Sequence, residues 1–284
     1  MPNGFKLLGE TGYLSDRNFL EQFYESEFDT GKDIESVSRL TQTNDNWQWG
    51  LLLRTTPFEF ENNTAWLPRG DFTVLGEPLL NGWLSWSSHT MAGYAQLNQA
   101  DPPNIPGDLF TPLPYYADLN GGVAMTRHEL SAPLNFGAFN VVPYAWGEVA
   151  GWSNDFTNNS LSRLVGSAGV RGSIMFSKVL PDVHSQMFNL NGLNHKMVFD
   201  FDWSTTQSNR DISLIPQWNE FDDNAQERFR ERLLVNTFGG TLPPQFDPRN
   251  FAIRSGAGSG VTAPYHELVG DLNVLRLGDR KSVV

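Results

Sequence analysis

Few residues of this chain stand in arrangements that could carry out chemistry. Asp29-Thr30-Gly31 has the order of an aspartic-protease loop, whose reaction needs two carboxylates that share a proton and therefore two such loops. The sequence contains one, and it runs into Lys32 and Asp33 rather than into small apolar residues. A turn before a strand explains the tripeptide better than catalysis does.

Two other short patterns also have plain explanations. Asp200 and Asp202 flank Phe201, which puts both carboxylates on one face of a strand. They could bind a hard cation, but one pair supplies too few oxygens for a calcium site. A row of side chains facing solvent or a lumen is the favoured interpretation. Arg69-Gly70-Asp71 matches a cell-adhesion tripeptide, and a turn into the apolar run that follows it accounts for these residues.

The remaining candidates for chemistry are scattered. The sequence has no cysteine, no phosphate-binding glycine loop and no Gly-x-Ser-x-Gly elbow. Its histidines show no metal-ligand spacing, although ligands assembled from distant strands remain an open alternative; they are His89, His128, His184, His195 and His266. The sequence therefore predicts no catalytic residue, no resident metal, no cofactor and a protein that is not an enzyme.

Composition narrows the class of protein. The 284 residues include 32 acidic and 20 basic side chains, and the net charge of −12 argues against binding of nucleic acid by bulk charge. The 26 glycines and 17 prolines are too many for a helical protein, while 13% of the residues are aromatic. No window is apolar enough for a transmembrane helix.

Period-two alternation is the dominant local pattern, in stretches separated by Gly, Asn and Asp. The runs that begin at Trp47 and Phe199 are the clearest, and the run at Val141 is weaker. Further strands are predicted at residues 33–43, 65–75, 82–97, 123–134, 164–176 and 266–277. Irregular loops are predicted at residues 99–119 and 239–263, and one helix is predicted at residues 222–235.

Strands of this kind suit two architectures. A soluble sandwich or propeller buries the apolar face, whereas a transmembrane barrel turns it towards lipid and its polar face towards a lumen. Long polar loops that alternate with short turns favour the barrel. We therefore predict an all-β fold, an antiparallel transmembrane β-barrel of the outer-membrane type, present here as a partial barrel.

One ordered succession of residues resembles a known family. Tyr13–Asp33, Asp45–Trp49, Trp66–Arg69 and Ser85–Tyr94 resemble, in this order, the start of the barrel in LPS-assembly outer-membrane proteins, also called organic-solvent-tolerance proteins (LptD). The resemblance is strongest over residues 13–97 and looser beyond. It implies a large barrel in the cell outer membrane of a Gram-negative bacterium.

The resemblance also implies a function in membrane biogenesis. In the family, lipopolysaccharide arrives from a periplasmic bridge of jellyroll transport proteins, and a plug lipoprotein sits inside the barrel. The lipid enters the outer leaflet through a lateral opening between the first and last strands. The implied partners are therefore lipopolysaccharide, the plug lipoprotein, the jellyroll bridge and outer-membrane lipid. The family's cysteine bridges have no counterpart in this cysteine-free sequence.

The chain is shorter than the family's barrel. At roughly twenty residues per strand and connection, it supplies about ten to thirteen strands, so we interpret it as an internal fragment. Residues 1–32 are assigned to a lead-in segment from a missing periplasmic domain, and residues 33–277 to the partial barrel. Residues 278–284 resemble translated sequencing adapter and are assigned to a non-native tail.

Residues 33–43 directly follow the lead-in segment and are predicted to be the first barrel strand. This strand has few apolar residues, which fits weak pairing at a lateral gate, and an ordinary rim strand explains it equally well. The gate candidates are Ser36, Ser38, Thr41 and Gln42. Two other functions stay open, a passive porin-like barrel and a soluble secreted protein that binds glycans through its Trp and Tyr side chains.

Overall fold

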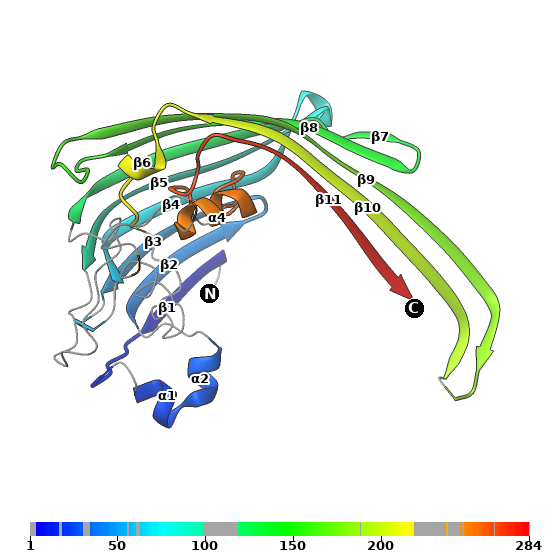
Figure 1. The fold of residues 1–284 in the computed structure, drawn as a ribbon, viewed down its shortest axis with the longest axis horizontal. Coiled ribbons are helices and arrows are strands. Elements are labelled where there is room, and N and C mark those ends of the chain that lie inside the picture. Colours follow the sequence, from blue (N-terminus) through cyan, green and yellow to red (C-terminus); the bar gives the residue numbers. More distant parts are fainter. Residues whose placement is uncertain are drawn as a thin grey trace.

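Antiparallel β-strands make up most of the fold (Figure 1). The computed structural model describes residues 4–16, 19–30, 35–55, 57–60, 63–98, 119–187, 189–218, 237, 245, 247–263 and 265–283. The strands are β1 (Phe5–Glu10), β2 (Ser36–Asn44), β3 (Trp47–Thr55), β4 (Asn63–Leu79), β5 (Leu84–Asn98), β6 (Leu119–Ser131), β7 (Leu134–Phe136), β8 (Phe139–Trp152), β9 (Leu161–Ser185), β10 (Leu190–Ser208) and β11 (Leu272–Val283). The helical elements are α1 (Phe19–Phe23), α2 (Glu25–Asp29), η2 (Leu80–Gly82), η4 (Ile212–Leu214) and α4 (Pro248–Ser255).

The strands of the described residues form one sheet of eleven strands. They follow chain order from β1 to β11, except that β7 pairs with β8 beside the main path. Every neighbouring pair is antiparallel, so the topology requires no crossover connection. β1 and β11 are the two edges, and no ladder joins them within the described residues, so the sheet is open.

The sheet arches over α4 and the chain that follows this helix (Figure 1). We call residues 247–263 and 265–271 the crossing segment. The side of the sheet that faces the crossing segment is the concave face, and the opposite side is the convex face. Residues paired directly across neighbouring strands point to the same face. The register therefore assigns every strand residue to one face or the other.

Alternation along each strand decides which side chains are buried. In β8, Tyr144, Trp146, Glu148, Ala150 and Trp152 are buried, and the residues between them are exposed or half-buried. β9 repeats this pattern from Leu161 to Gly169. Since β8 and β9 pair in register along this stretch, the buried residues of both strands share the concave face.

The hydrophobic core lies against the concave face. Trp66, Met91, Met125 and Trp152 come from four different strands and pack in one cluster with Trp218, which follows β10. A second cluster joins β8 and β9 to the crossing segment, through Tyr144, Trp146, Val165 and Val269. Burial of one large apolar side chain stabilises a fold by about 1.5–3 kcal/mol. These contacts therefore hold the chain after β10 against the sheet.

The antiparallel all-β class and most of the predicted strands are confirmed. The predicted strands at 33–43, 65–75, 82–97, 123–134 and 164–176 fall in β2, β4, β5, β6 and β9. The alternating runs at Trp47, Val141 and Phe199 fall in β3, β8 and β10. The last predicted strand starts later than expected, at Leu272, because His266 to Val269 are buried in the crossing segment.

The prediction that residues 33–43 form the first strand is wrong. β1 lies in the segment assigned to the lead-in region and pairs with β2, from Phe5 opposite Gln42 to Glu10 opposite Val37. Six residues broken by Lys6 and Gly9 are too few to show a periodic pattern. The free edge of β2 supplies the hydrogen bonds that make this short segment a strand.

The predicted loop at 239–263 contains a helix, α4. The Asp247 side chain accepts a hydrogen bond from the Arg249 backbone N–H, and Pro248 occupies the first turn, as is typical of helix starts. Gly256, at φ 91°, ends the helix in the left-handed conformation. Residues that suggested a loop therefore serve as the ends of a short helix.

Several assignments fall partly or wholly beyond the described residues. The predicted helix at 222–235 and the predicted loop at 99–119, apart from Leu119, lie outside them. Residues 278–283 belong to β11 and pair with β10. Among the helices of the described chain, none is both long and apolar enough to cross a membrane.

Candidate functional site

A buried charged cluster joins three strands on the concave face. Arg127 of β6 lies directly opposite Glu148 of β8, and Arg163 comes from β9. Arg127 Nε donates to Glu148 Oε2 at 2.9 Å, and Arg163 Nη2 donates to Glu148 Oε1 at 2.5 Å. The exposed fractions of all three side chains are 0–1%. One carboxylate thus holds two guanidinium groups in fixed positions.

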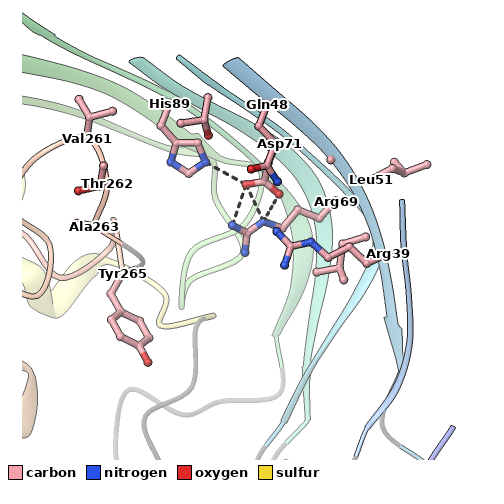
Figure 2. A pocket seen from close by; sticks show the side chains of 13 residues that line it. Arg39, Gln48, Leu51, Arg69, Asp71, His89, Val261, Thr262, Ala263 and Tyr265 are labelled. Atoms are coloured by element: carbon pink, nitrogen blue, oxygen red, sulfur yellow. Dashed lines mark hydrogen bonds and ion pairs between the residues drawn. The ribbon is translucent and has the colours of Figure 1, made fainter. Parts of the chain in front are cut away.

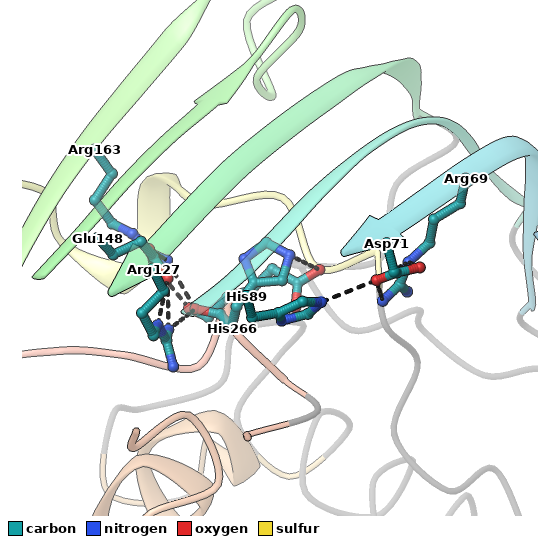
Figure 3. Close-up of polar contacts among 8 residues, drawn as sticks. Arg69, Asp71, His89, Arg127, Glu148, Arg163 and His266 are labelled. Carbon is teal, nitrogen blue, oxygen red and sulfur yellow. Dashed lines mark hydrogen bonds and ion pairs between the residues drawn. The ribbon is translucent and has the colours of Figure 1, made fainter. Parts of the chain in front are cut away.

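The two arginines bind the backbone of the crossing segment (Figure 3). Arg127 Nη1 donates to the carbonyl oxygens of Gly258 at 2.7 Å and Gly260 at 2.5 Å. Arg163 donates to the carbonyl oxygens of His266, at 2.7 Å, and Glu267, at 3.0 Å. Hydrogen bonds from charged donors are about twice as strong as neutral ones. The cluster therefore fastens the crossing segment to the sheet.

Aromatic rings and a second carboxylate complete the surroundings of the cluster. Arg127 lies over the Trp146 ring at 4.6 Å, and Arg163 lies over the Trp152 ring at 5.2 Å. Glu267 is buried in the crossing segment and brings a negative charge to match the second arginine. A buried charge without a partner costs several kcal/mol, so this balance is a condition for stability.

His266 lies inside this cluster as a neutral side chain. Its pKa is well below the usual value, because complete burial disfavours the imidazolium and because Arg163 and Arg127 repel it. The ring stacks against Trp152 with centroids 6.4 Å apart. Neither ring nitrogen has a hydrogen-bond partner among the described residues. A proton on this ring would add a third cation to a buried site.

A second polar group lies on β4 and β5. Arg69 Nε and Nη2 donate to the Asp71 carboxylate at 3.0 and 2.9 Å, and His89 Nε2 lies 3.0 Å from Asp71 Oδ1. These residues line a cavity of about 470 Å³ between β2–β5 and the crossing segment (Figure 2). The far wall of the cavity includes Thr262 and Tyr265. The cavity can hold a small polar molecule.

Asp200 and Asp202 face the concave side from β10, as the alternation predicts. The Tyr144 hydroxyl donates to Asp202 Oδ1 at 3.0 Å, and Arg280 Nη2 donates to Asp200 Oδ1 at 3.0 Å. Arg276 Nη1 lies 3.8 Å from Asp202 Oδ2. Arginines from β11 therefore balance this acidic row. No group of three or more His, Asp or Glu side chains that could hold a metal occurs in the described residues.

The gate candidates lie together on β2, but this strand is not an edge. Ser36, Ser38 and Gln42 share one face, and Thr41 points to the other. The Gln42 side chain accepts a hydrogen bond from Trp49 Nε1 at 2.9 Å. Because β2 pairs with β1 on one side and β3 on the other, its backbone is held on both sides.

Arg69-Gly70-Asp71 lies inside β4 and is not the expected turn. The ladder between β4 and β5 shifts register between Trp66 and Arg69, so the irregularity falls just before the tripeptide. Both charged side chains then point to the concave face and pair with each other. The five histidines do not come together. His89 lies beside Asp71, and His266 lies beside Glu267.

No protein-family model matches the chain, and no curated protein sequence matches it either. The function must therefore be argued from the structure of the sheet and from the resemblance noted in the sequence.

The Arg127–Glu148–Arg163 cluster was not predicted from the sequence. Glu148 and Arg163 each stand alone in an uncharged stretch of alternating strand, whereas Arg127 is followed by His128 and Glu129. All three occupy positions that the pattern assigns to the same face as buried neighbours. The isolation of Glu148 and Arg163 was the available signal. The carbonyl partners could not be found, because they lie more than a hundred residues further along the chain.

Proposed function

We propose that the chain is part of the wall of a transmembrane β-barrel of the outer-membrane type. The observation that carries this proposal is the distribution of apolar side chains over the two faces. In β10, Phe199, Phe201 and Trp203 point to the convex face, and the aspartates between them point to the concave face. Leu275 and Leu277 extend the apolar row onto β11 and are 58% and 76% exposed.

The same arrangement continues over the rest of the sheet. Large apolar side chains are exposed on the convex positions of six further strand sites: Leu51, Leu53, Phe72, Leu130, Val149 and Leu164. Monomeric proteins dissolved in water rarely expose large apolar patches, so the gathering of large apolar side chains on one face favours a face that is covered by lipid. In a barrel wall, the outward residues contact lipid while the inward residues contact water or a plug.

The open edges support a wall that continues beyond the described strands. β1 and β11 each have one side without a strand partner among the described residues. Unpaired backbone groups in a bilayer cost several kcal/mol each, so a wall in lipid must be closed. Further strands of a longer protein, or pairing between these two edges, would meet this requirement.

Within this class, we favour the translocon that inserts lipopolysaccharide into the outer leaflet. The resemblance over residues 13–97 supports this function. The two faces also suit the lipid, because acyl chains need an apolar surface and phosphorylated sugars need a polar one. The proposed partners are lipopolysaccharide, a plug lipoprotein, the periplasmic jellyroll bridge and outer-membrane lipid.

The lateral gate of such a translocon would lie at an edge of this sheet. Since β1 is an edge strand and pairs with β2, a gate at this edge would open beside β1. Ser36, Ser38, Thr41 and Gln42 would then act one strand further in. β1 is the shortest strand apart from β7, and few hydrogen bonds hold it, which suits an edge that opens.

Cell fractionation tests the membrane location. Outer-membrane and soluble fractions are blotted with an antibody against the chain, with and without boiling. We expect a heat-shifted band in the outer-membrane fraction, because closed barrels resist detergent until they are boiled. A band in the soluble fraction would contradict both barrel functions and favour glycan binding.

Depletion of the protein separates the translocon from a porin. Loss of surface lipopolysaccharide, with small-solute uptake unchanged, is the expected result for a translocon. Reduced uptake of small solutes with normal surface lipopolysaccharide would support the porin and overturn the proposed function.

A further inference from the structure

The cavity under β2–β5 has a surplus of positive charge in an otherwise acidic chain. Two arginines, Arg39 and Arg69, and one carboxylate, Asp71, line it. His89 adds a further positive charge only when it is protonated. The whole chain carries a net charge of −12. An anion would therefore be repelled by most of the molecule and attracted by this cavity.

The two arginines belong to one row across the sheet. Arg39 of β2 pairs with Leu52 of β3, and Leu52 pairs with Arg69 of β4. Strands are spaced about 4.8 Å apart, so the two arginine Cα atoms are separated by roughly 10 Å on the same face. Long side chains from such positions can converge on one small group. Figure 2 shows both arginines directed into the cavity.

The two arginines differ in what already binds them. Asp71 occupies Nε and Nη2 of Arg69, and the Trp66 ring lies 5.0 Å from this guanidinium. These contacts fix the Arg69 side chain and leave Nη1 without an acceptor among the described residues. No carboxylate in the described part of the chain pairs with Arg39. A fixed arginine and an uncompensated arginine together suit a phosphate, which accepts paired hydrogen bonds from guanidinium groups.

Uncharged polar groups surround the cationic end of the cavity. The side chains of Gln48, Thr73 and Thr262 line it and have no side-chain hydrogen-bond partner among the described residues. Amide and hydroxyl groups can both donate and accept, which is what sugar hydroxyls require. The backbone of the crossing segment closes one side. The cavity thus offers an anion site next to a site for hydroxyl groups.

We infer that this cavity binds a phosphorylated sugar, with Arg39 and Arg69 on the phosphate and Gln48, Thr73 and Thr262 on the hydroxyl groups. The inference deepens the proposed function by naming where a lipid head group contacts the wall, and it rests on that function only for the source of the ligand. The same chemistry is found in a glycolipid head group and in a free sugar phosphate.

Calorimetric titration of the purified full chain in detergent with glucosamine 1-phosphate tests the inference. We expect binding at least tenfold tighter than that of glucosamine or of inorganic phosphate. Arg39→Gln should weaken it by about tenfold or more, because a charged hydrogen bond is lost, and Arg39→Lys should weaken it less. Arg254→Gln removes an exposed arginine of α4 outside the cavity and should leave binding unchanged.

Other results of this titration would overturn the inference. Unchanged affinity in Arg39→Gln would do so, and so would equal affinity for inorganic phosphate or for unphosphorylated glucosamine. Circular dichroism of the variants checks that the sheet is intact. Because Arg39 is exposed and has no described partner, we expect no change in the spectrum.

A second titration identifies the source of the ligand. Lipid A with and without its phosphates is added in detergent micelles to the wild type and to Arg39→Gln. Binding of phosphorylated lipid A that depends on Arg39 identifies a lipid head group, whereas binding of glucosamine 1-phosphate alone identifies a free sugar phosphate. If the chain binds through Arg39 but fractionates as a soluble protein, the proposed function fails and the cavity stands. If it lies in the outer membrane and neither probe binds, the cavity fails and the proposed function stands.

Discussion

At the scale of single residues, Glu148 determines whether two buried arginines are compensated. It accepts hydrogen bonds from both Arg127 and Arg163, and all three side chains are out of contact with solvent. Glu148→Gln keeps the shape and removes the charge. We expect a loss of about 3–5 kcal/mol in the free energy of unfolding, because two guanidinium groups then share an insufficient negative charge. Denaturant unfolding of the wild type and the variant in lipid vesicles measures this loss of stability.

Glu129 provides the matched control for Glu148. It also accepts from an arginine, Arg171, at 3.0 Å, but the Arg171 side chain is 43% exposed. Solvent reaches the Arg171 end of this pair, while the Glu129 side chain is 12% exposed, so Glu129→Gln should cost less stability than Glu148→Gln. Equal losses in the two variants would show that the buried cluster has no special role.

His266 makes the stability of the same region depend on pH. Its pKa is lowered in the folded chain by burial and by the two arginines, so the unfolded chain takes up a proton first. Stability is complete above the unfolded pKa of about 6.5 and falls as the pH drops below it, by about 1.4 kcal/mol per pH unit until the folded pKa is reached. His266→Phe should flatten this slope between pH 6.5 and 5.5.

Comparison of the wild type with two histidine variants separates the contribution of His266 to the pH dependence from that of the carboxylates. Unfolding midpoints at pH 7.5, 6.5 and 5.5 are measured for the wild type, for His266→Phe and for His128→Gln. His128 is an exposed residue that contacts the half-buried Trp86 and lies outside the buried cluster, so its replacement should preserve the slope. A wild-type slope retained in His266→Phe would contradict the assignment.

At the scale of strands, one glycine shows how neighbouring elements fit. Gly172 of β9 pairs with Phe201 of β10, and the Phe201 ring covers the position that a Cβ at Gly172 would occupy. Gly172→Ala should therefore displace the ring and destabilise the fold by about 1–3 kcal/mol. Gly166 of the same strand provides the control, because a Cβ at this position would meet nothing within 4 Å.

A double-variant cycle checks the cause. In Phe201→Ala the ring is absent, so adding Gly172→Ala should cost little further stability. If Gly172→Ala destabilises both backgrounds equally, the effect comes from the strand backbone and not from the ring.

The predictability of these elements from sequence follows from the range of their contacts. β3, β8 and β10 each contain alternating apolar and polar residues, so each can be predicted without knowledge of its partner strands. In β10, Phe199 and Phe201 are the clearest example. β1 was missed because its pairing with β2 supplies the order that six residues lack. α4 was missed because its end residues, Pro248 and Gly256, are also typical of loops.

The site was harder to predict than the strands for the same reason. The position of Asp200 and Asp202 on the same face of a strand follows from their spacing alone, and the structure confirms it. The contacts of Arg127 and Arg163 with the crossing segment depend on a fold that returns distant chain to the concave face. Spacing in the sequence contains no information on such a return.

At the scale of the whole molecule, the two faces of the sheet should contact different surroundings. The chain has no cysteine, so a single introduced cysteine can carry a fluorescent label at one chosen position. Leu275 lies on the convex face and its neighbour Arg276 on the concave face, where it is paired with Asp202 in the register of the sheet. These adjacent positions therefore sample opposite sides of one strand.

Quenching by nitroxide lipids measures which label contacts the bilayer. The label on Leu275→Cys should be quenched strongly, and the label on Arg276→Cys should be quenched weakly and respond instead to iodide in water, because only convex residues face acyl chains in a barrel wall. Weak quenching of the Leu275→Cys label by both nitroxide lipids and iodide would mean that the apolar convex face is covered by protein. The proposal of a membrane wall would then be wrong, and the arch would be one layer of a larger soluble assembly.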